Sequence, residues 1–212
     1  MSTTRTIFAI VAASLLCPSI ARADVGLWLE AGVRVQVTDR VDFGVAQHLR
    51  FEGGNSQVSA VMPEAGLELD VNELLELGVG YRYEYERRDD ELEGAHRVHA
   101  DGTVSVDVGL AKVSYRLRGQ DRVSEEGGTR VRNRLAAKLR LPLLWNPAAS
   151  IETFHELSGG STEWDKTRIT AGVELEIWEQ DVQSFYRIDV PRDPMAPIVH
   201  IVGLELTAKV SR

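Results

Sequence analysis

The sequence is poor in several residue types and patterns, and each shortage excludes a class of protein. Its single cysteine, Cys17, lies near the N-terminus, so the rest of the chain holds no disulfide framework and no cysteine-based metal or nucleophile site. No phosphate loop, dinucleotide fingerprint or calcium loop occurs, and we expect no metal and no cofactor. No apolar run approaches the ~20 residues that a membrane-spanning helix needs, so a membrane location would have to come from strands.

The N-terminal segment has the parts of a secretory signal peptide. Arg5 gives a short basic region, and residues 7–16 form an apolar run of suitable length. A small-x-small pattern ends at Ala23, and we therefore predict cleavage between Ala23 and Asp24. A buried N-terminal helix is the alternative, but helix caps are absent here. This predicts export and leaves residues 24–212 as one barrel domain.

The charge balance argues against a nucleic-acid partner. The whole sequence carries a formal charge of −8; the predicted signal peptide holds two arginines and no acid, so the remainder carries −10. Binding to a phosphate backbone needs cations clustered on one exposed face. We therefore expect no nucleic-acid partner.

From Val25 onward the hydrophobic pattern has a period of two residues. Between Leu75 and Glu86, leucine, valine and tyrosine alternate with glutamate, glycine and arginine. Strict alternation of this length is typical of strands with one apolar and one polar face. We count about eleven such segments, at roughly 25–38, 40–52, 60–71, 74–87, 95–107, 110–120, 129–141, 148–157, 166–177, 182–190 and 198–210.

The connections between these segments alternate in length, which is typical of transmembrane barrels with short periplasmic turns and long extracellular loops. We predict an all-β fold, an antiparallel up-and-down transmembrane β-barrel of about 10–12 strands. Because single-chain bacterial barrels have an even number of strands, we expect ten or twelve. Pro63 lacks an N–H and is expected at a strand entrance. Longer polar loops are expected at 53–59, 88–94, 121–128, 158–165 and 191–197.

Two features favour a membrane barrel over a soluble one. Glycines lie on the charged face, where they would weaken solvent-exposed strands but make room in a narrow lumen. The apolar face is almost unbroken, and its tyrosines near strand ends fit the aromatic girdles of membrane barrels. A soluble periplasmic β-barrel that binds a lipophilic ligand is the alternative.

On this interpretation the charged face lines the lumen, and its charges are sorted by strand. The predicted basic wall consists of Lys112, Arg116, Arg118, Arg130, Arg132, Arg134, Lys138 and Arg140. The predicted acidic wall consists of Glu68, Asp70, Glu76, Glu84, Glu86, Glu152, Glu156, Glu174 and Glu176.

Counting back from the expected turns pairs some of these charges. A turn at 142–147 sets Glu152 roughly opposite Lys138 and Glu156 opposite Arg134, and one at 179–181 sets Glu174 opposite Arg187. Such pairs would satisfy charges enclosed in a low-dielectric interior. The charges then either plug the barrel with salt bridges or line a polarised pore. A plug is favoured because ten to twelve strands enclose little free width once filled with Arg and Glu.

Histidines invite an enzyme hypothesis, since a Ser–His pair would suit a lipid-modifying barrel. His155 with Ser158 is one candidate, and His96 with His99 is the corresponding candidate for a metal site. Residues three apart in a strand point to opposite faces, so neither pair converges. We therefore expect a non-enzymatic barrel, either structural or a narrow channel for small polar solutes, with a lipid-modifying enzyme as the alternative.

Several motifs carry a resemblance to a known family. They are His48-Leu49-Arg50-Phe51, Arg130-Val131-Arg132-Asn133-Arg134-Leu135, Glu152-Thr153-Phe154 and Arg168-x-x-x-Gly172. In this order they resemble a family of small proteobacterial outer-membrane β-barrels classed only as a domain of unknown function. The resemblance implies a membrane barrel and brings no activity or catalytic residue with it. One departure is the end of the chain, Lys209-Val210-Ser211-Arg212, where many outer-membrane barrels have an aromatic residue.

Together these features predict a location and partners. We expect the protein in the outer membrane of a Gram-negative bacterium after Sec export. We further expect a monomer that contacts outer-membrane lipid and is inserted by the barrel insertion machinery.

Overall fold

The structure, a computed structural model, describes residues 25–51, 58–88, 91–123, 128–142, 145–158, 161–177 and 179–210. The predicted signal peptide and its cleavage site between Ala23 and Asp24 lie outside these residues. Within the described ranges there is no helix long and apolar enough to cross a membrane.

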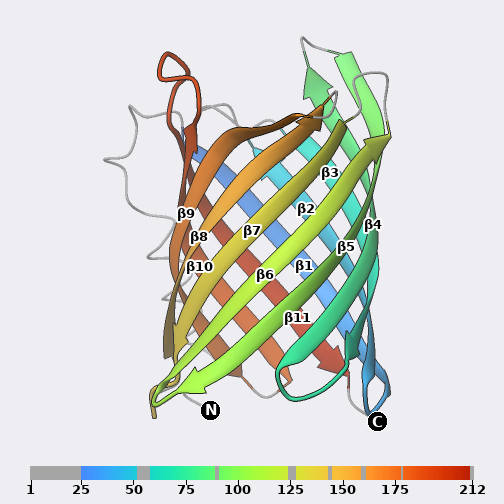
Figure 1. Cartoon of the computed structure of the whole chain (residues 1–212). Coiled ribbons are helices and arrows are strands. Elements are labelled where there is room, and N and C mark those ends of the chain that lie inside the picture. The colour runs from blue at the N-terminus through green and yellow to red at the C-terminus, as the bar shows by residue number, and fades with distance from the viewer. Residues whose placement is uncertain are drawn as a thin grey trace, which may run out of the picture.

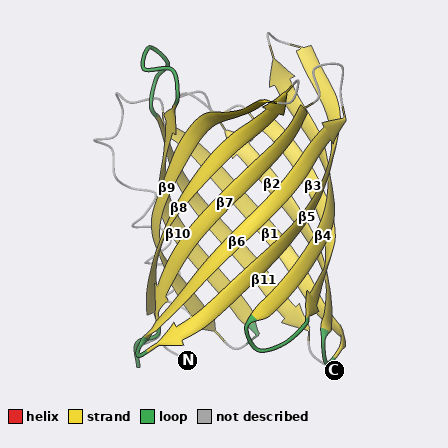
Figure 2. Ribbon diagram, viewed as in Figure 1, coloured by secondary structure: helices red, strands yellow, loops and turns green. Residues whose placement is uncertain are grey.

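The described residues form eleven strands that close into one barrel (Figure 1, Figure 2). This confirms the prediction of an all-β barrel. The strands are β1 (Val25–Thr38), β2 (Val41–Phe51), β3 (Val58–Asp70), β4 (Leu75–Arg88), β5 (Glu91–Val108), β6 (Ala111–Val123), β7 (Gly128–Leu139), β8 (Trp145–Ser158), β9 (Ser161–Ile177), β10 (Gln180–Pro191) and β11 (Val199–Val210).

The expectation of an even strand count, with every pair antiparallel, is wrong. Successive strands pair antiparallel around the ring, but β1 closes against β11 in parallel. The reason is geometric, because an odd number of alternating strands leaves the first and last running the same way. The register of this pair runs from Val25 opposite His200 to Val35 opposite Val210.

The strands are steeply tilted, as the register shows. We call the end with the β1–β2, β3–β4, β5–β6, β7–β8 and β9–β10 connections the turn end, and the opposite end the loop end. Starting at Val25 at the loop end of β1, register partners followed through β11, β10 and onward reach Leu75 at the turn end of β4. Closing a sheet requires such a stagger, and it places side chains of separated strands at the same height in the lumen.

Two of the expected long loops are wrong because the strands extend through them. β4 continues to Arg88 and β5 begins at Glu91, so most of the expected loop at 88–94 is strand. β8 and β9 likewise approach within a two-residue connection after Ser158. The β4–β5 hairpin projects beyond its neighbours at the loop end (Figure 1). Most of the expected loop at 53–59 lies outside the described residues. The expected loop at 121–128 is shorter than predicted, because β6 continues to Val123 and β7 begins at Gly128; residues 124–127 lie outside the described ranges.

Pro63 lies inside β3 rather than at its entrance, contrary to expectation. It pairs with Gln47 of β2, whereas the ladder between β3 and β4 passes from Val61 directly to Glu64. The missing N–H therefore falls at a gap in one ladder while the other stays intact.

The wall of the barrel carries its large apolar side chains outward. Exposed hydrophobic residues occur on every strand, among them Val79, Leu117 and Ile169. The buried apolar set is small by comparison: Ala60, Met62, Ala95, Phe154, Phe185 and Ile201. Buried charged and polar side chains, including the fully enclosed Glu84, complete the interior. The barrel is therefore inside-out relative to a water-soluble domain.

A cysteine pair across the closing strands tests the odd count. In a chain with Cys17→Ser, we expect Leu29→Cys and Leu204→Cys to form a disulfide, because these two residues are register partners on the outer face. The matched control, Leu29→Cys with Leu206→Cys, should not cross-link, since two residues of slip puts the Cα atoms beyond the ~7 Å limit for a disulfide. Mobility on a non-reducing gel measures both. Cross-linking of the control pair alone, or of neither pair, contradicts the parallel closure.

Candidate functional site

The lumen is lined by the polar face of each strand, and the predicted wall residues lie on these positions except Arg140, which follows the end of β7. Ion pairs show this directly, since they join strands that are not neighbours in the ring. Arg116 of β6 lies 3.3 Å from Glu152 of β8, and Lys138 of β7 lies 2.7 Å from Glu174 of β9. Only the concave side of the barrel brings such pairs together.

The basic residues of β6 and β7 face one another across the ladder. Lys112 is opposite Lys138, Arg116 is opposite Arg134, and Arg118 is opposite Arg132. Like charges directly opposite destabilise a sheet, so this part of the wall depends on acids supplied by other strands.

Glu152 is the main acid for this wall. Its two carboxylate oxygens each accept a 2.9 Å hydrogen bond from Arg132, and it also accepts one of 3.3 Å from Arg116. Arg168 of β9 approaches to 3.9 Å. Only 4% of Glu152 is exposed, so its charge depends on these cations rather than on water.

Two further carboxylates, those of Glu84 and Glu86, lie on β4 nearer the loop end. Glu84 is 1% exposed and contacts Arg97 at 2.9 Å and Arg122 at 3.4 Å. Glu86 contacts Arg122 at 3.2 Å and Arg50 of β2 at 3.4 Å. These two members of the acidic wall therefore pair with arginines outside the predicted basic wall.

Two aromatic side chains that sequence reasoning missed lie among these arginines. Three guanidinium groups, from Arg50, Arg187 and Arg168, lie 4.2, 4.7 and 5.1 Å from the ring of Trp28. The Phe154 ring has Arg132 at 4.7 Å and Arg168 at 4.9 Å. Cations over aromatic faces are attracted by the ring quadrupole. The alternation of the sequence could have placed Phe154 in the lumen, because it lies two residues from Glu152 and therefore on the same face of the strand.

A further chain of contacts crosses from β1 to β4 and was not predicted as a site. The ring nitrogens of His48 lie 2.9 Å from Glu30 and 3.1 Å from Glu64, and Glu64 also accepts from Arg82. Arg168 and Asp189 form another unpredicted pair, with two hydrogen bonds of 2.7 Å. Together with the arginine–aromatic contacts and the ion pairs of Glu84, Glu86 and Glu152, these side chains connect opposite sides of the lumen nearer the loop end. We call this group the plug: Trp28, Glu30, His48, Arg50, Glu64, Arg82, Glu84, Glu86, Arg97, Arg116, Arg122, Arg132, Glu152, Phe154, Arg168, Arg187 and Asp189.

Three predicted pairings are wrong, all in the same way. Glu152 is opposite Arg134 and Glu156 is opposite Arg130. The residue opposite Glu174 is Gln183, while Arg187 lies opposite Thr170. Both turns are centred nearer the N-terminus than predicted, which shifts each partner by an even number of residues and so keeps it on the same face.

Near the turn end the lumen opens into a cavity of about 290 Å³, which we call the turn-end cavity. Its position follows from its lining, since Lys112 lies just after the β5–β6 turn and Lys138 just before the β7–β8 connection. Small side chains leave this space. The lining residues are Glu76, Thr103, Ser105, Lys112, Ser114, Arg134, Ala136, Ala137, Lys138, Ala148, Ala149, Ser150, Thr170, Glu174 and Gln183.

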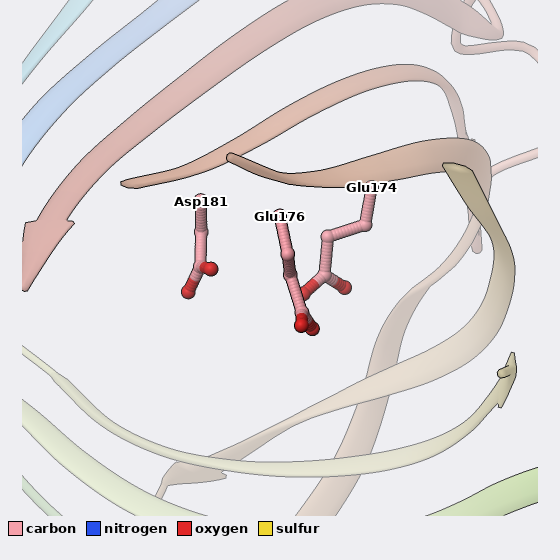
Figure 3. A group of neighbouring side chains, drawn as sticks. All are labelled: Glu174, Glu176 and Asp181. Carbon is pink, nitrogen blue, oxygen red and sulfur yellow. The ribbon is translucent and has the colours of Figure 1, made fainter. Parts of the chain in front are cut away.

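One acidic group beside this cavity has the donor set of a cation site. Oxygens of Glu174, Glu176 and Asp181 lie within 4.8 Å of one another, and all three side chains point the same way (Figure 3). Lys138 already contacts Glu174 at 2.7 Å and Glu176 at 3.1 Å. A metal ion would have to displace this ammonium group.

The histidine candidates do not converge on a site. His96 lies on the outer face with its Nδ1 2.6 Å from the Tyr81 hydroxyl, whereas His99 lies in the lumen, 3.9 Å from Glu64. The Nε2 of His155 lies 3.2 Å from the Thr153 hydroxyl. The Ser158 side chain lies outside the described residues.

Comparison with known proteins gives a family but no activity. Residues 25–187 match the family described as "Protein of unknown function (DUF2490)". The chain belongs to this family. The match extends from the start of β1 into β10, and it confirms the resemblance to a domain of unknown function. No curated protein and no solved structure matches the chain.

Removing the carboxylate of Glu152 should destabilise this family member strongly. We expect Glu152→Gln to lower the free energy of unfolding by about 3 kcal/mol, because Arg132 and Arg116 would keep buried charges without a counter-charge. The matched control is Glu176→Gln, on the same lumen face but 54% exposed, for which we expect a loss below about 0.5 kcal/mol. Denaturant unfolding in detergent micelles measures both. Equal losses would contradict a central role for Glu152.

Proposed function

We propose that this protein is an outer-membrane β-barrel of a Gram-negative bacterium, with a non-enzymatic role and a lumen closed by the plug. The observation that carries the proposal is the inside-out distribution of side chains. Large apolar residues cover the outer wall, whereas Glu84, Glu152 and Arg168 are among the buried residues. In water such a surface would be an aggregation hazard, whereas in a bilayer it matches the solvent.

The few polar groups on the outer face support the same location. The Tyr81 hydroxyl lies 2.6 Å from His96, and the Tyr186 hydroxyl lies 2.6 Å from His200. These contacts satisfy side chains that lipid cannot hydrogen-bond. Tyrosines of this kind are typical of the membrane–water interface of barrels. We infer contact with outer-membrane lipid from these two features together.

The filled loop-end half supports a structural role over an open channel. Arginine, glutamate and aromatic side chains from β1 to β10 meet there, while the turn-end cavity lies nearer the other end. A narrow channel for small polar solutes is the second candidate, favoured by that cavity, and it would require the plug side chains to move.

Fractionation tests the membrane location. We expect the protein in the outer-membrane fraction, and the unboiled sample should migrate faster on a gel than the boiled one, since a closed barrel resists detergent unfolding. Recovery in the periplasmic fraction with identical migration before and after boiling would contradict the proposal.

Planar-bilayer recording tests whether the plug closes the lumen. We expect little steady conductance from the wild-type chain and a clear increase from Trp28→Ala with Phe154→Ala, because these rings hold the arginines across the lumen. Phe43→Ala is the matched control: this residue is 39% exposed on the outer face, and conductance should stay at the wild-type level. A large, stable wild-type conductance would instead favour the channel.

A further inference from the structure

Two cations of the β6–β7 ladder have no ion-pair contact within the described residues. Glu152 forms ion pairs with Arg132 and Arg116. Asp101 lies 3.2 Å from Arg118, and Glu174 pairs with Lys138. Arg130 lies beside Glu156 and is 3.4 Å from Asp165. The remaining members of the predicted basic wall within this ladder are Arg134 and Lys112. Neither has an ion pair or a hydrogen bond to any residue within the described ranges.

The reason Arg134 is left over can be seen in the register. Its partner on β8 is Glu152, and its partner on β6 is Arg116. Glu152 is directed to Arg132, Arg116 and Arg168 instead, and Glu205 acts on Arg134 only at longer range. Arg134 is half-buried, and no carboxylate of the described residues lies within ion-pair distance of it, so this position favours an anion from outside the chain.

Lys112 is in the same situation farther toward the turn end. Its register partners are Lys138 on β7 and Asp107 on β5. Lys138 is a like charge, and Asp107 contacts Arg140 at 3.0 Å. Glu76 acts on Lys112 at longer range.

Both unpaired cations line the turn-end cavity, together with groups able to hydrogen-bond a small solute. The hydroxyls of Ser114, Ser150 and Thr170 lie in the same lining. Ligand sites are commonly concave spaces of this kind with a few placed polar groups, and charge-assisted hydrogen bonds from arginine to carboxylate or phosphate are among the strongest.

We propose that the turn-end cavity binds a small anion bearing a carboxylate or phosphate group. Arg134 and Lys112 supply the charge partners, and the serine and threonine hydroxyls supply further donors. The inference goes beyond the proposed membrane role, because binding is measured on the folded barrel in detergent whatever its cellular location.

Titration calorimetry on the full chain in detergent micelles tests the site, with inorganic phosphate and lactate as separate probes. We expect saturable binding of at least one probe, and the stronger of the two identifies the preferred anionic group. Arg134→Gln and Lys112→Gln should each weaken that binding at least ~10-fold, since each removes a charged partner. Arg134→Lys keeps the charge and should retain more of the affinity than Arg134→Gln.

Arg140→Gln is the matched control. Arg140 is a cation of the same wall, but it pairs with Asp107 and does not line the cavity. Its loss should leave the affinity unchanged, and the gel shift on boiling reports for every variant that the barrel is folded; if one glutamine variant fails to fold, the other decides. Absence of saturable binding of both probes at millimolar concentration overturns the proposal, as does an equal loss in Arg140→Gln.

Discussion

The pairing of enclosed arginines with a few carboxylates is the interaction on which the rest of this barrel depends. Because most apolar residues face outward, the interior is filled largely by polar side chains, and most of the long ones are charged. A guanidinium group removed from water needs a counter-charge close by, and Glu152 and Glu84 each serve more than one cation. Trp28 and Phe154 add a second kind of partner, since arginines that share a carboxylate also lie over their rings.

Strand tilt decides which charges can meet. The β6–β7 ladder would be unfavourable alone, because cation lies opposite cation along it. The stagger of a closed barrel brings β8 and β9 to the same height as β6 and β7, so that Arg116 reaches Glu152 and Lys138 reaches Glu174 across an intervening strand. The ion pairs and the closure of the sheet thus support each other, and neither follows from nearest-neighbour pairing alone.

The period of two residues was sufficient to predict the strands and the face of the wall residues that lie on them, because an error of an even number of residues in register leaves each side chain on the same face. It was not sufficient to predict which residues face each other across neighbouring strands. Placing the centre of a turn two residues too late moves each partner by four, which is why Glu152 was matched with Lys138 instead of Arg134. The strand number was misjudged by imposing an even count on a pattern that contains eleven segments. Trp28 and Phe154 were overlooked because aromatic residues in barrels were expected at the lipid interface, whereas parity places them inside.

The lumen is filled near the loop end and open near the turn end because the inward side chains differ in length. Toward the loop end, arginine, glutamate and aromatic residues reach across the lumen and meet. Toward the turn end, alanine, serine and threonine occupy several of the inward positions and cannot reach, so a cavity of about 290 Å³ remains. Near the loop end the acids are engaged in ion pairs. Arg134 and Lys112, which have no ion-pair partner among the described residues, line the turn-end cavity. The uneven distribution of acids among cations therefore links the two regions. Arg134 is left unpaired because Glu152 is directed to Arg132 and Arg116, and Lys112 is left unpaired because Asp107 is directed to Arg140.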